Sequence, residues 1–405
     1  MEPKIRLKGF GGEWKTYKIG NLTSITTGAT PSTSISSYWD NGTIRWMSSG
    51  ELNNRHIYDV KGRITEDGYN SCGTHLIPPG CVLIGLAGQG KTRGTAAINH
   101  VELCTNQSIA ALLPNAQMFD SSYLYHYIDN KYLELRGMST GDGGRGGLNK
   151  QILLDFEVKL PSMEEQIALA SYFDSIDSLI QSTTKKIESL KQVKAASLQS
   201  MFPQEGETTP RVRFKGFERK WETHKVSDLL EERREPGKMS SDYPLMAFIA
   251  NVGVAEKGDR YDRSSLVSDV ENKVYKKTEY GDFIYSSNNL ETGSIGLNLY
   301  GKATISPVYS IFKCTDIADA AFIGRAFVRR EFINCMIKWR QGVMYGQWRI
   351  HEDDFLKIEV SVPSLNEQKK IGEYFTALDN QISYQTQRLE KLKQIKAACL
   401  DNMFV

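Results

Sequence analysis

Two stretches of this 405-residue chain repeat one another. PSMEEQIALASYFDSIDSLIQSTTKKIESLKQVKAASLQSMF occupies residues 161–202, and PSLNEQKKIGEYFTALDNQISYQTQRLEKLKQIKAACLDNMF occupies residues 363–404. They align without a gap at an offset of 202 residues and are identical at 19 of 42 positions. Internal repetition on this scale indicates that the chain is built from two similar halves.

Both stretches are predicted to be long helices. Ser162 and Ser364 each follow a proline and precede a glutamate by three residues, which is the capping-box arrangement of a helix start. About 40 residues at a rise of 1.5 Å give a rod of about 60 Å, too long to be hidden in one small domain. Because both rods lie in one chain behind different globular segments, we expect them to pair as an antiparallel coiled coil. Dimerisation through another chain is the alternative.

The predicted helix contact follows a heptad pattern, with seam residues spaced alternately by three and four. The seam consists of Phe173, Ile176, Ile180, Thr183, Ile187, Leu190, Lys194, Ser197 and Met201 in the first stretch, and of Phe375, Leu378, Ile382, Gln385, Leu389, Leu392, Lys396, Cys399 and Met403 in the second.

A second repeat opens each half. RLKGFGGEWKTYKIGNL (residues 6–22) and RFKGFERKWETHKVSDL (residues 213–229) share eight of 17 positions, including Trp14 and Trp221. Between the repeats the halves look unrelated. We therefore predict a first variable segment over 1–160, a first long helix over 161–202, a linker (203–212) with a second variable segment up to 362, and a second long helix over 363–405.

The dissimilar segments are predicted to share one mixed fold. Short apolar runs at 44–47, 81–86 and 108–113, and at 246–250, 283–286 and 308–313, indicate strands. One amphipathic helix is predicted in each half, over 120–138 and 319–341. The expected fold class is α+β: two similar mixed domains separated by two long antiparallel coiled-coil helices, with a pseudo-twofold internal repeat.

Composition is that of a soluble chain with several domains. Hydrophobic residues make up 40% and charged residues 24%, and no run approaches the roughly 18 apolar residues of a membrane span. The six cysteines show no disulfide or zinc spacing, so we expect a cytoplasmic protein without a metal site. The net charge of +2 is small for a protein that grips DNA unaided.

This organisation resembles the specificity subunit of Type I restriction-modification enzymes over essentially the whole chain. The resemblance is carried by R-[LF]-K-G-F-x-x-x-W at the start of both halves, by P-S-x-x-E-Q at 161–166 and 363–368, and by K-x-A-A-x-L-x-x-M-F at both helix ends. It implies two target-recognition domains that each read one half of a bipartite, asymmetric site in double-stranded DNA. The antiparallel helices would set the unread spacer.

The resemblance also implies the partners. Two methyltransferase (modification) subunits would dock on the helices and use S-adenosylmethionine to methylate adenine, and motor-nuclease (restriction) subunits would use ATP and magnesium. The chain itself would be a non-catalytic specificity subunit with no cofactor of its own. A coiled-coil scaffold without DNA recognition is a further alternative.

A competing motif favours an enzyme. Residues 85–92, GLAGQGKT, satisfy the P-loop pattern G-x-x-x-x-G-K-[ST] and follow an apolar run. A P-loop must open a helix, yet the continuation RGTAAIN has little helical periodicity. A strand and loop of the recognition fold is the preferred interpretation, and a P-loop NTP-binding enzyme is the alternative.

Loops rich in glycine, arginine and amides are the candidate DNA contacts, because Arg pairs with guanine, Asn and Gln pair with adenine, and glycine lets backbone approach phosphate. They lie in two loops of each half, and the later loop precedes the long helix in both. The candidates are Gln89, Lys91, Arg93, Arg145, Asn149 and Lys150 in the first half, and Ser287, Asn288, Asn289, Thr292, Tyr345, Gln347 and Arg349 in the second.

Overall fold

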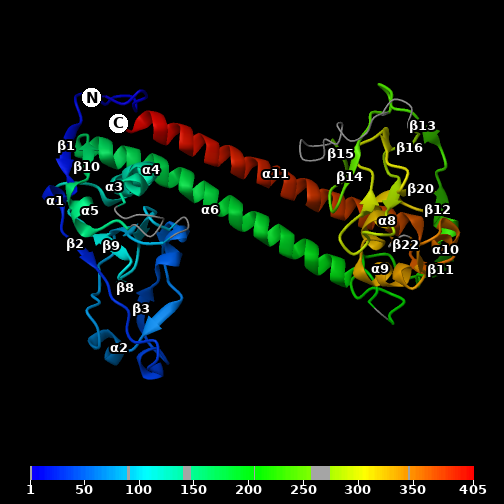
Figure 1. Cartoon of the computed structure of the whole chain (residues 1–405), viewed down its shortest axis with the longest axis horizontal. Coiled ribbons are helices and arrows are strands. Elements are labelled where there is room, and N and C mark those ends of the chain that lie inside the picture. Colours follow the sequence, from blue (N-terminus) through cyan, green and yellow to red (C-terminus); the bar gives the residue numbers. More distant parts are fainter. Residues whose placement is uncertain (1, 89–91, 140–146, 205, 257–273, 345–346) are drawn as a thin grey trace. The chain divides into compact units, whose positions relative to one another are not determined.

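The computed structural model describes residues 2–88, 92–139, 147–204, 206–256, 274–344 and 347–405. The chain forms two compact units. Unit 1 is Met1–Lys185 with Gln387–Val405, and unit 2 is Lys186–Thr386. Each unit therefore contains one recognition domain and a part of each long helix (Figure 1).

The two long helices are α6 (Met163–Ser200) and α11 (Leu365–Met403). Their predicted seam is confirmed, because every seam residue is buried or half-buried. In unit 1 the Tyr172 hydroxyl lies 3.4 Å from the Cys399 sulfur, and in unit 2 the Ser197 and Tyr374 hydroxyls lie 2.9 Å apart. In both units the early part of one helix meets the late part of the other, so the helices run antiparallel, as predicted.

Unit 1 has a five-stranded sheet of order β2-β9-β6-β7-β4, a three-stranded sheet β5-β3-β8 and the antiparallel pair β1-β10. Its strands are β1 (Lys15–Lys18), β2 (Ile25–Thr27), β3 (Ile44–Met47), β4 (His56–Ile57), β5 (Gly62–Ile64), β6 (Val82–Gly85), β7 (Ala96–Asn99), β8 (Cys104–Thr105), β9 (Ile109–Leu112) and β10 (Glu157–Leu160). Its shorter helices are α1 (Ile19–Leu22), α2 (Glu66–Asn70), α3 (Ser121–Asn130), α4 (Tyr132–Gly137) and α5 (Lys150–Asp155), with 3-10 turns at Ser36–Tyr38 and Ser49–Asn54.

Unit 2 repeats the central sheet as β12-β20-β17-β18, and pairs β11 with β23 as unit 1 pairs β1 with β10. Its strands are β11 (Glu222–Lys225), β12 (Leu230–Glu232), β13 (Pro236–Gly237), β14 (Ala247–Ile249), β15 (Gly253–Ala255), β16 (Tyr275–Thr278), β17 (Phe283–Tyr285), β18 (Ile295–Leu297), β19 (Ala303–Ile305), β20 (Ser310–Cys314), β21 (Gln341–Met344), β22 (Gln347–Arg349) and β23 (Glu359–Val362). Its shorter helices are α7 (Val226–Leu229), α8 (Ala320–Ala326), α9 (Arg330–Ile337) and α10 (Glu352–Leu356). The six predicted strands are all present.

The single helix predicted in each half is wrong in one respect, because each is broken in two. In unit 1 the chain leaves helical geometry at Lys131, between α3 and α4 (φ −88°, ψ 16°). In unit 2 it is extended at Arg329, before α9 (φ −73°, ψ 149°). The helix starts are alike, since Asp120 and Asp319 accept hydrogen bonds from the backbone N–H three residues later.

A phenylalanine at the end of each long helix completes the core of a recognition domain. In unit 1 the Phe404 ring lies 5.4 Å from Tyr123 and 5.3 Å from Phe173. In unit 2 the Phe202 ring lies 5.5 Å from Phe322 and 6.0 Å from Phe375. The helix that follows one recognition domain thus ends in the core of the other.

The start of each half is tied to a helix end in the same way. The Ile5 N–H donates to the Asn402 carbonyl at 2.9 Å in unit 1, and the Val212 N–H donates to the Ser200 carbonyl at 3.0 Å in unit 2. The second pair is linked through the chain at 203–212, whereas the first brings the two ends of the chain together, where Figure 1 marks N and C. In both units, the residue just before the first repeated motif is therefore hydrogen-bonded to the end of a long helix.

Across the described ranges, neither the long helices nor any shorter one combines the length with the apolar character that crossing a membrane requires.

Candidate DNA interface

The two candidate loops of the first half meet in unit 1. The loop after β6 and the segment before α5 are joined where the Leu148 N–H donates to the Leu86 carbonyl at 2.9 Å. Residues far apart in sequence are thereby brought to one surface. Of the residues predicted there, Gln89, Lys91 and Arg145 lie outside the described residues.

The remaining candidate residues of unit 1 differ in their burial and in their hydrogen bonds. Arg93 is half-buried in the turn between β6 and β7. The Asn149 side chain caps α5 by accepting from the Ile152 N–H at 2.9 Å, so this residue has a structural task. Lys150 is the exposed first residue of that helix.

The candidate loops of the second half meet at the corresponding point of unit 2. The Ile350 N–H donates to the Ser287 hydroxyl at 3.1 Å, and Ile350 stands 202 residues after Leu148. The Ser287 hydroxyl thus links the two loops through a hydrogen bond. Both units bring the loop after the third strand in the sheet order, β6 in unit 1 and β17 in unit 2, against the segment that precedes the last short helix.

The other candidates of unit 2 surround this joint. Asn288, Asn289 and Thr292 are exposed, and the Thr292 hydroxyl donates to the Asn289 carbonyl at 3.1 Å, which shapes the turn. Arg349 keeps 67% of its side chain exposed, 4.0 Å from the Glu352 carboxylate. Gln347 lies in β22, its side chain outside the described part, and Tyr345 is outside it altogether.

The P-loop interpretation of residues 85–92 is wrong. After Thr92 the chain makes a turn and enters β7, which pairs with β6 as an antiparallel hairpin, so no helix begins there to hold phosphates. Gly94 has a positive φ of 80°, and its N–H donates to the Gly85 carbonyl at 2.8 Å. Gly94 therefore serves a tight turn between the two strands.

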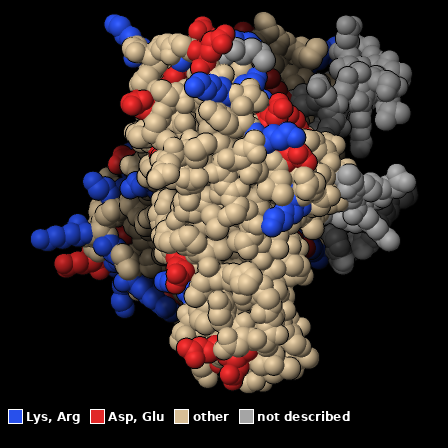
Figure 2. Space-filling model, turned by 90° about the vertical axis from the view of Figure 1, so that its left-hand side faces the viewer, with Lys and Arg blue, Asp and Glu red and all other residues tan. Residues whose placement is uncertain are grey.

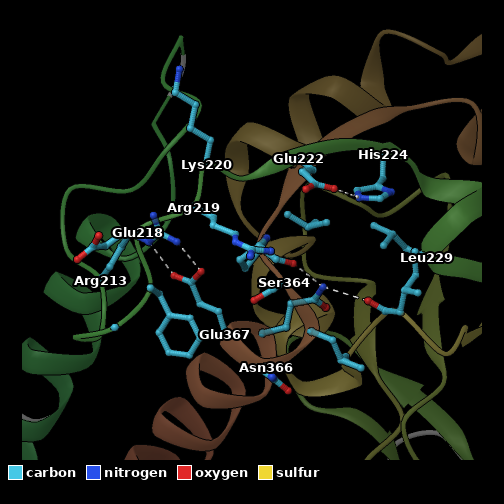
Figure 3. Close-up of a pocket in the computed structure, with 17 residues that line it drawn as sticks. Arg213, Glu218, Arg219, Lys220, Glu222, His224, Leu229, Ser364, Asn366 and Glu367 are labelled. Carbon is cyan, nitrogen blue, oxygen red and sulfur yellow. Dashed lines mark hydrogen bonds and ion pairs between the residues drawn. The ribbon is translucent and has the colours of Figure 1, made fainter.

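The repeated motifs form a buried ion pair in each unit that the sequence did not predict. The Arg6 guanidinium donates to both carboxylate oxygens of Glu165, at 2.8 and 2.7 Å, and Arg213 does the same to Glu367, at 2.9 and 2.7 Å (Figure 3). The side chains of Glu165 and Glu367 are only 1% and 2% exposed. The hydrogen bonds that Arg6 and Arg213 donate to these carboxylates raise the pKa of both arginines.

This pairing corrects the predicted capping box. The Glu165 N–H approaches the Ser162 hydroxyl at 3.3 Å, as a cap requires, but the Glu165 carboxylate binds arginine and does not return to the helix start. The motifs were visible in register in both halves. Their contact joins residues 159 apart, which spacing alone does not reveal.

The glutamine of P-S-x-x-E-Q joins the long helix to the recognition domain. Gln166 accepts from the Asp120 N–H at 3.0 Å, and Gln368 accepts from the Asp319 N–H at 3.0 Å. Both are buried. The signature therefore positions the helix that covers each sheet.

In unit 2 this repeated frame borders a pocket of about 490 Å³ between the 216–220 loop and the start of α11 (Figure 3). The loop carries Glu218, Arg219 and Lys220. In unit 1 the corresponding Gly11 and Gly12 carbonyls accept from the Arg6 guanidinium at 2.9 and 2.7 Å. The arginine–glutamate ion pair is shared by the two units, but the loop beside it differs in sequence.

The charge on the face of unit 1 that Figure 2 shows is mixed. Figure 2 shows one face of unit 1, where most of the surface is uncharged, Lys and Arg gather along the left-hand edge, and Asp and Glu gather at the lower tip. In Figure 1 this lower lobe contains α2, whose first turn carries Glu66 and Asp67. This face has no continuous basic track of its own.

Two recognition domains of one fold, each with its own loops and tied to a shared antiparallel helix pair, define a protein that presents two different binding surfaces. A family model described as "Type I restriction modification DNA specificity domain" matches residues 11–192 and again residues 218–394. The chain therefore belongs to the Type I restriction-modification DNA specificity family, and its role is DNA recognition.

Individual relatives agree with this assignment. The chain is 26% identical over 351 residues to the Type I restriction enzyme MjaIX specificity subunit of Methanocaldococcus jannaschii, covering 81% of this chain and 76% of that protein. The MjaVIII specificity subunit of the same organism is 24% identical over 296 residues, 69% of this chain and 68% of that one. The crystal structure of a Type I restriction-modification S subunit from M. genitalium shares the fold at a TM-score of 0.65, with 13% identity over 100% of this chain and 99% of that chain.

Proposed function

We propose that the chain reads a bipartite, asymmetric DNA site, with one half read by the loops of unit 1 and the other by the loops of unit 2. The observation that supports this most is the corresponding loop joint, Leu148 with Leu86 and Ile350 with Ser287. One geometry is used twice, with different exposed side chains around it. Two domains that share one backbone arrangement but carry different loop side chains are suited to read two half-sites of different sequence.

We further propose that the antiparallel helices set the length of the unread spacer and that the chain docks two methyltransferase subunits and the motor-nuclease subunits. S-adenosylmethionine, ATP and magnesium then belong to those subunits, and this chain is a non-catalytic cytoplasmic component. The small net charge of +2 supports the dependence on partners, because phosphate contacts supply most non-specific affinity for DNA.

The test is to sequence methylated adenines in cells that carry the cognate modification subunit with and without this chain. The expected result is methylation in one motif with two defined halves, only when the chain is present. Substituting Arg93→Ala with Lys150→Ala should relax one half of the motif, and Asn289→Ala with Arg349→Ala should relax the other. Each lost base contact should cost about 1–3 kcal/mol of discrimination.

Matched controls are the exposed Lys61→Ala in unit 1 and Lys313→Ala in unit 2, which lie outside the candidate loops and should leave the motif unchanged. Relaxation of the same half by both loop variants, or methylation of that motif in the absence of the chain, would contradict the proposal.

A further inference from the structure

The tip of a hairpin in unit 2 lies against the candidate DNA loop that follows β17. Strands β14 and β15 pair antiparallel and leave residues 250–252 as the tip, and all three are exposed. The Asn251 N–H donates to the Gly293 carbonyl at 3.0 Å, and the Asn251 side-chain nitrogen donates to the Thr292 carbonyl at 3.4 Å. The hairpin tip and the candidate loop therefore form one surface.

The hairpin is held in this place at its base and at its tip. Phe248 and Val254 lie opposite each other on the two strands and are buried in a core together with Ile284 of β17. At the tip, Gly293 has a positive φ of 96°, and a side chain at this position would collide with the Asn251 amide. The amide is thus placed over the loop by packing alone, as precise recognition of a ligand requires.

The Asn251 side chain has the chemistry to read a base. Its oxygen accepts no hydrogen bond from the residues that the structure describes, and its nitrogen carries a second hydrogen besides the one directed at Thr292. An acceptor and a donor on one amide match the N6 donor and the N7 acceptor that adenine presents in the major groove. The neighbouring Val252 is 64% exposed, and its apolar side chain suits the methyl group of thymine.

Unit 1 uses the corresponding place differently. The residue with a left-handed backbone beside its loop strand is Arg55, at φ 64°, whose carbonyl accepts from the Ile98 N–H of β7 at 2.8 Å. The Arg55 guanidinium binds the Asp129 carboxylate of α3 and donates to the Ala96 carbonyl at 3.2 Å. Because this guanidinium is engaged within its own domain, a contribution like that of Asn251 is specific to unit 2.

We propose that Asn251 is a specificity-determining residue that reads the adenine of one A·T base pair in the half-site of unit 2, with Val252 against the methyl group of the thymine. This inference rests on the proposed function, and it adds a residue outside the candidate loops and the identity of the base pair. A phosphate contact would use only the donor of the amide, whereas adenine uses the donor and the acceptor together.

The test is methylation by the complex of the full chain with its cognate modification subunit, on DNA that carries each single base-pair change of the motif. Asn251→Gly removes the amide and keeps the left-handed backbone. The preference for A·T should fall by about tenfold at one position, in the half that Asn289→Ala with Arg349→Ala relaxes. Asn251→Asp should instead favour cytosine there, because a carboxylate accepts from the cytosine amino group. Val252→Ala should give a smaller loss at the same position.

The matched control is Asn41→Gly in unit 1, which alters another exposed asparagine with a left-handed backbone (φ 58°) and should leave the motif unchanged. Hydrogen exchange in unit 2 reports whether the hairpin stays folded. If Asn251→Gly loosens it, Asn251→Asp decides, because aspartate also tolerates this backbone and fills the same space.

An unchanged motif with both Asn251 variants would overturn the inference. So would relaxation at a G·C pair, in the other half, or evenly over the whole half-site, since the tip would then only shape the loop. Weaker binding of the modification subunit with an unchanged motif would overturn it as well, and would indicate a protein contact at the tip. If the unaltered complex methylates no bipartite motif, the proposed function itself fails.

Discussion

The two units hold the same interhelical ion pair but attach their recognition domains to it with different chemistry. In unit 1, Asp177 of α6 accepts from Lys396 of α11 at 2.8 Å and contacts His56 of β4 at 3.3 Å. In unit 2, Asp379 of α11 binds Lys194 of α6 and Arg325 of α8. Lys194 and Lys396 are seam residues at equivalent positions, and Asp177 and Asp379, which lie beside the seam, are equivalent to each other as well.

The recognition domain contacts the long-helix carboxylates through histidines in unit 1 and through an arginine in unit 2. His126 of α3 is fully buried and its Nε2 lies 2.8 Å from Asp174, whereas Arg325 stands at the corresponding sixth position after the helix cap. His100 stacks on Tyr58 and lies 3.1 Å from His56. The contact between the helices is thus constant, and the contact with the recognition domain varies with the domain that it carries.

The largest expected effect comes from removing the helix-end phenylalanines. Phe404→Ala should destabilise unit 1 and Phe202→Ala should destabilise unit 2, each by about 3 to 5 kcal/mol, because each ring fills an aromatic core. Hydrogen exchange measured separately for the two units is the suitable readout, since a chain of two units need not unfold in one step. Leu133→Ala, at a 78% exposed site, is the control. A loss confined to the opposite unit would contradict the assignment of each helix end.

A smaller and equal loss is expected from the buried ion pairs. Glu165→Gln and Glu367→Gln should each lower stability by about 2 kcal/mol, because the arginine loses its charged partner in a largely buried place. The control is Glu164→Gln, an exposed residue whose counterpart in the second repeat is Asn366. The loss of stability of both variants is measured by thermal unfolding, together with hydrogen exchange followed separately in each unit. A clear difference between the two variants would show that the shared frame is not energetically equivalent.

Acidification should destabilise unit 1 more than unit 2, and this effect should be smaller than those of the substitutions. Burial lowers the pKa of His126 and of His100, and the nearby His56 lowers that of His100 further, while Asp174 opposes both shifts. A histidine with a lowered folded pKa gives stability that is present above its unfolded value of about 6.5 and is lost as the pH falls toward the folded pKa. Arginine does not titrate in this range.

Unit 1 should therefore lose more exchange protection than unit 2 does as the pH falls below about 6.5. The buried ion pair of Asp177 should survive this range, because the His56 hydrogen bond and Lys396 outweigh burial and lower the pKa of that carboxyl to about 2. His126→Gln, which keeps a donor for Asp174, should reduce the difference. Equal loss of protection in both units would contradict the contrast drawn between them.

Much of the frame could be predicted from the sequence because its determinants are local or periodic. The seam from Phe173 to Met201 and the strands at 82–85 and 283–285 follow directly from hydrophobic spacing. The repeat in register predicted the shared fold. The break at Lys131 was missed because an amphipathic pattern continues through it.

The site was less predictable, because it depends on contacts between distant residues. Spacing located the loops but not the joint between Leu86 and Leu148, nor the pairing of Arg6 with Glu165. Composition also cannot separate a capping side chain such as Asn149 from one that faces DNA.

The most direct test of the account is to shorten the helix pair. Removing the equivalent heptads 182–188 and 384–390 from α6 and α11 keeps the seam in register and takes about 10 Å from each helix. At about 3.4 Å per base pair, methylation mapping should then show the same two half-sites with a spacer about three base pairs shorter. An unchanged spacer, in a complex that still methylates, would contradict the idea that this helix pair sets the distance between the two recognition domains.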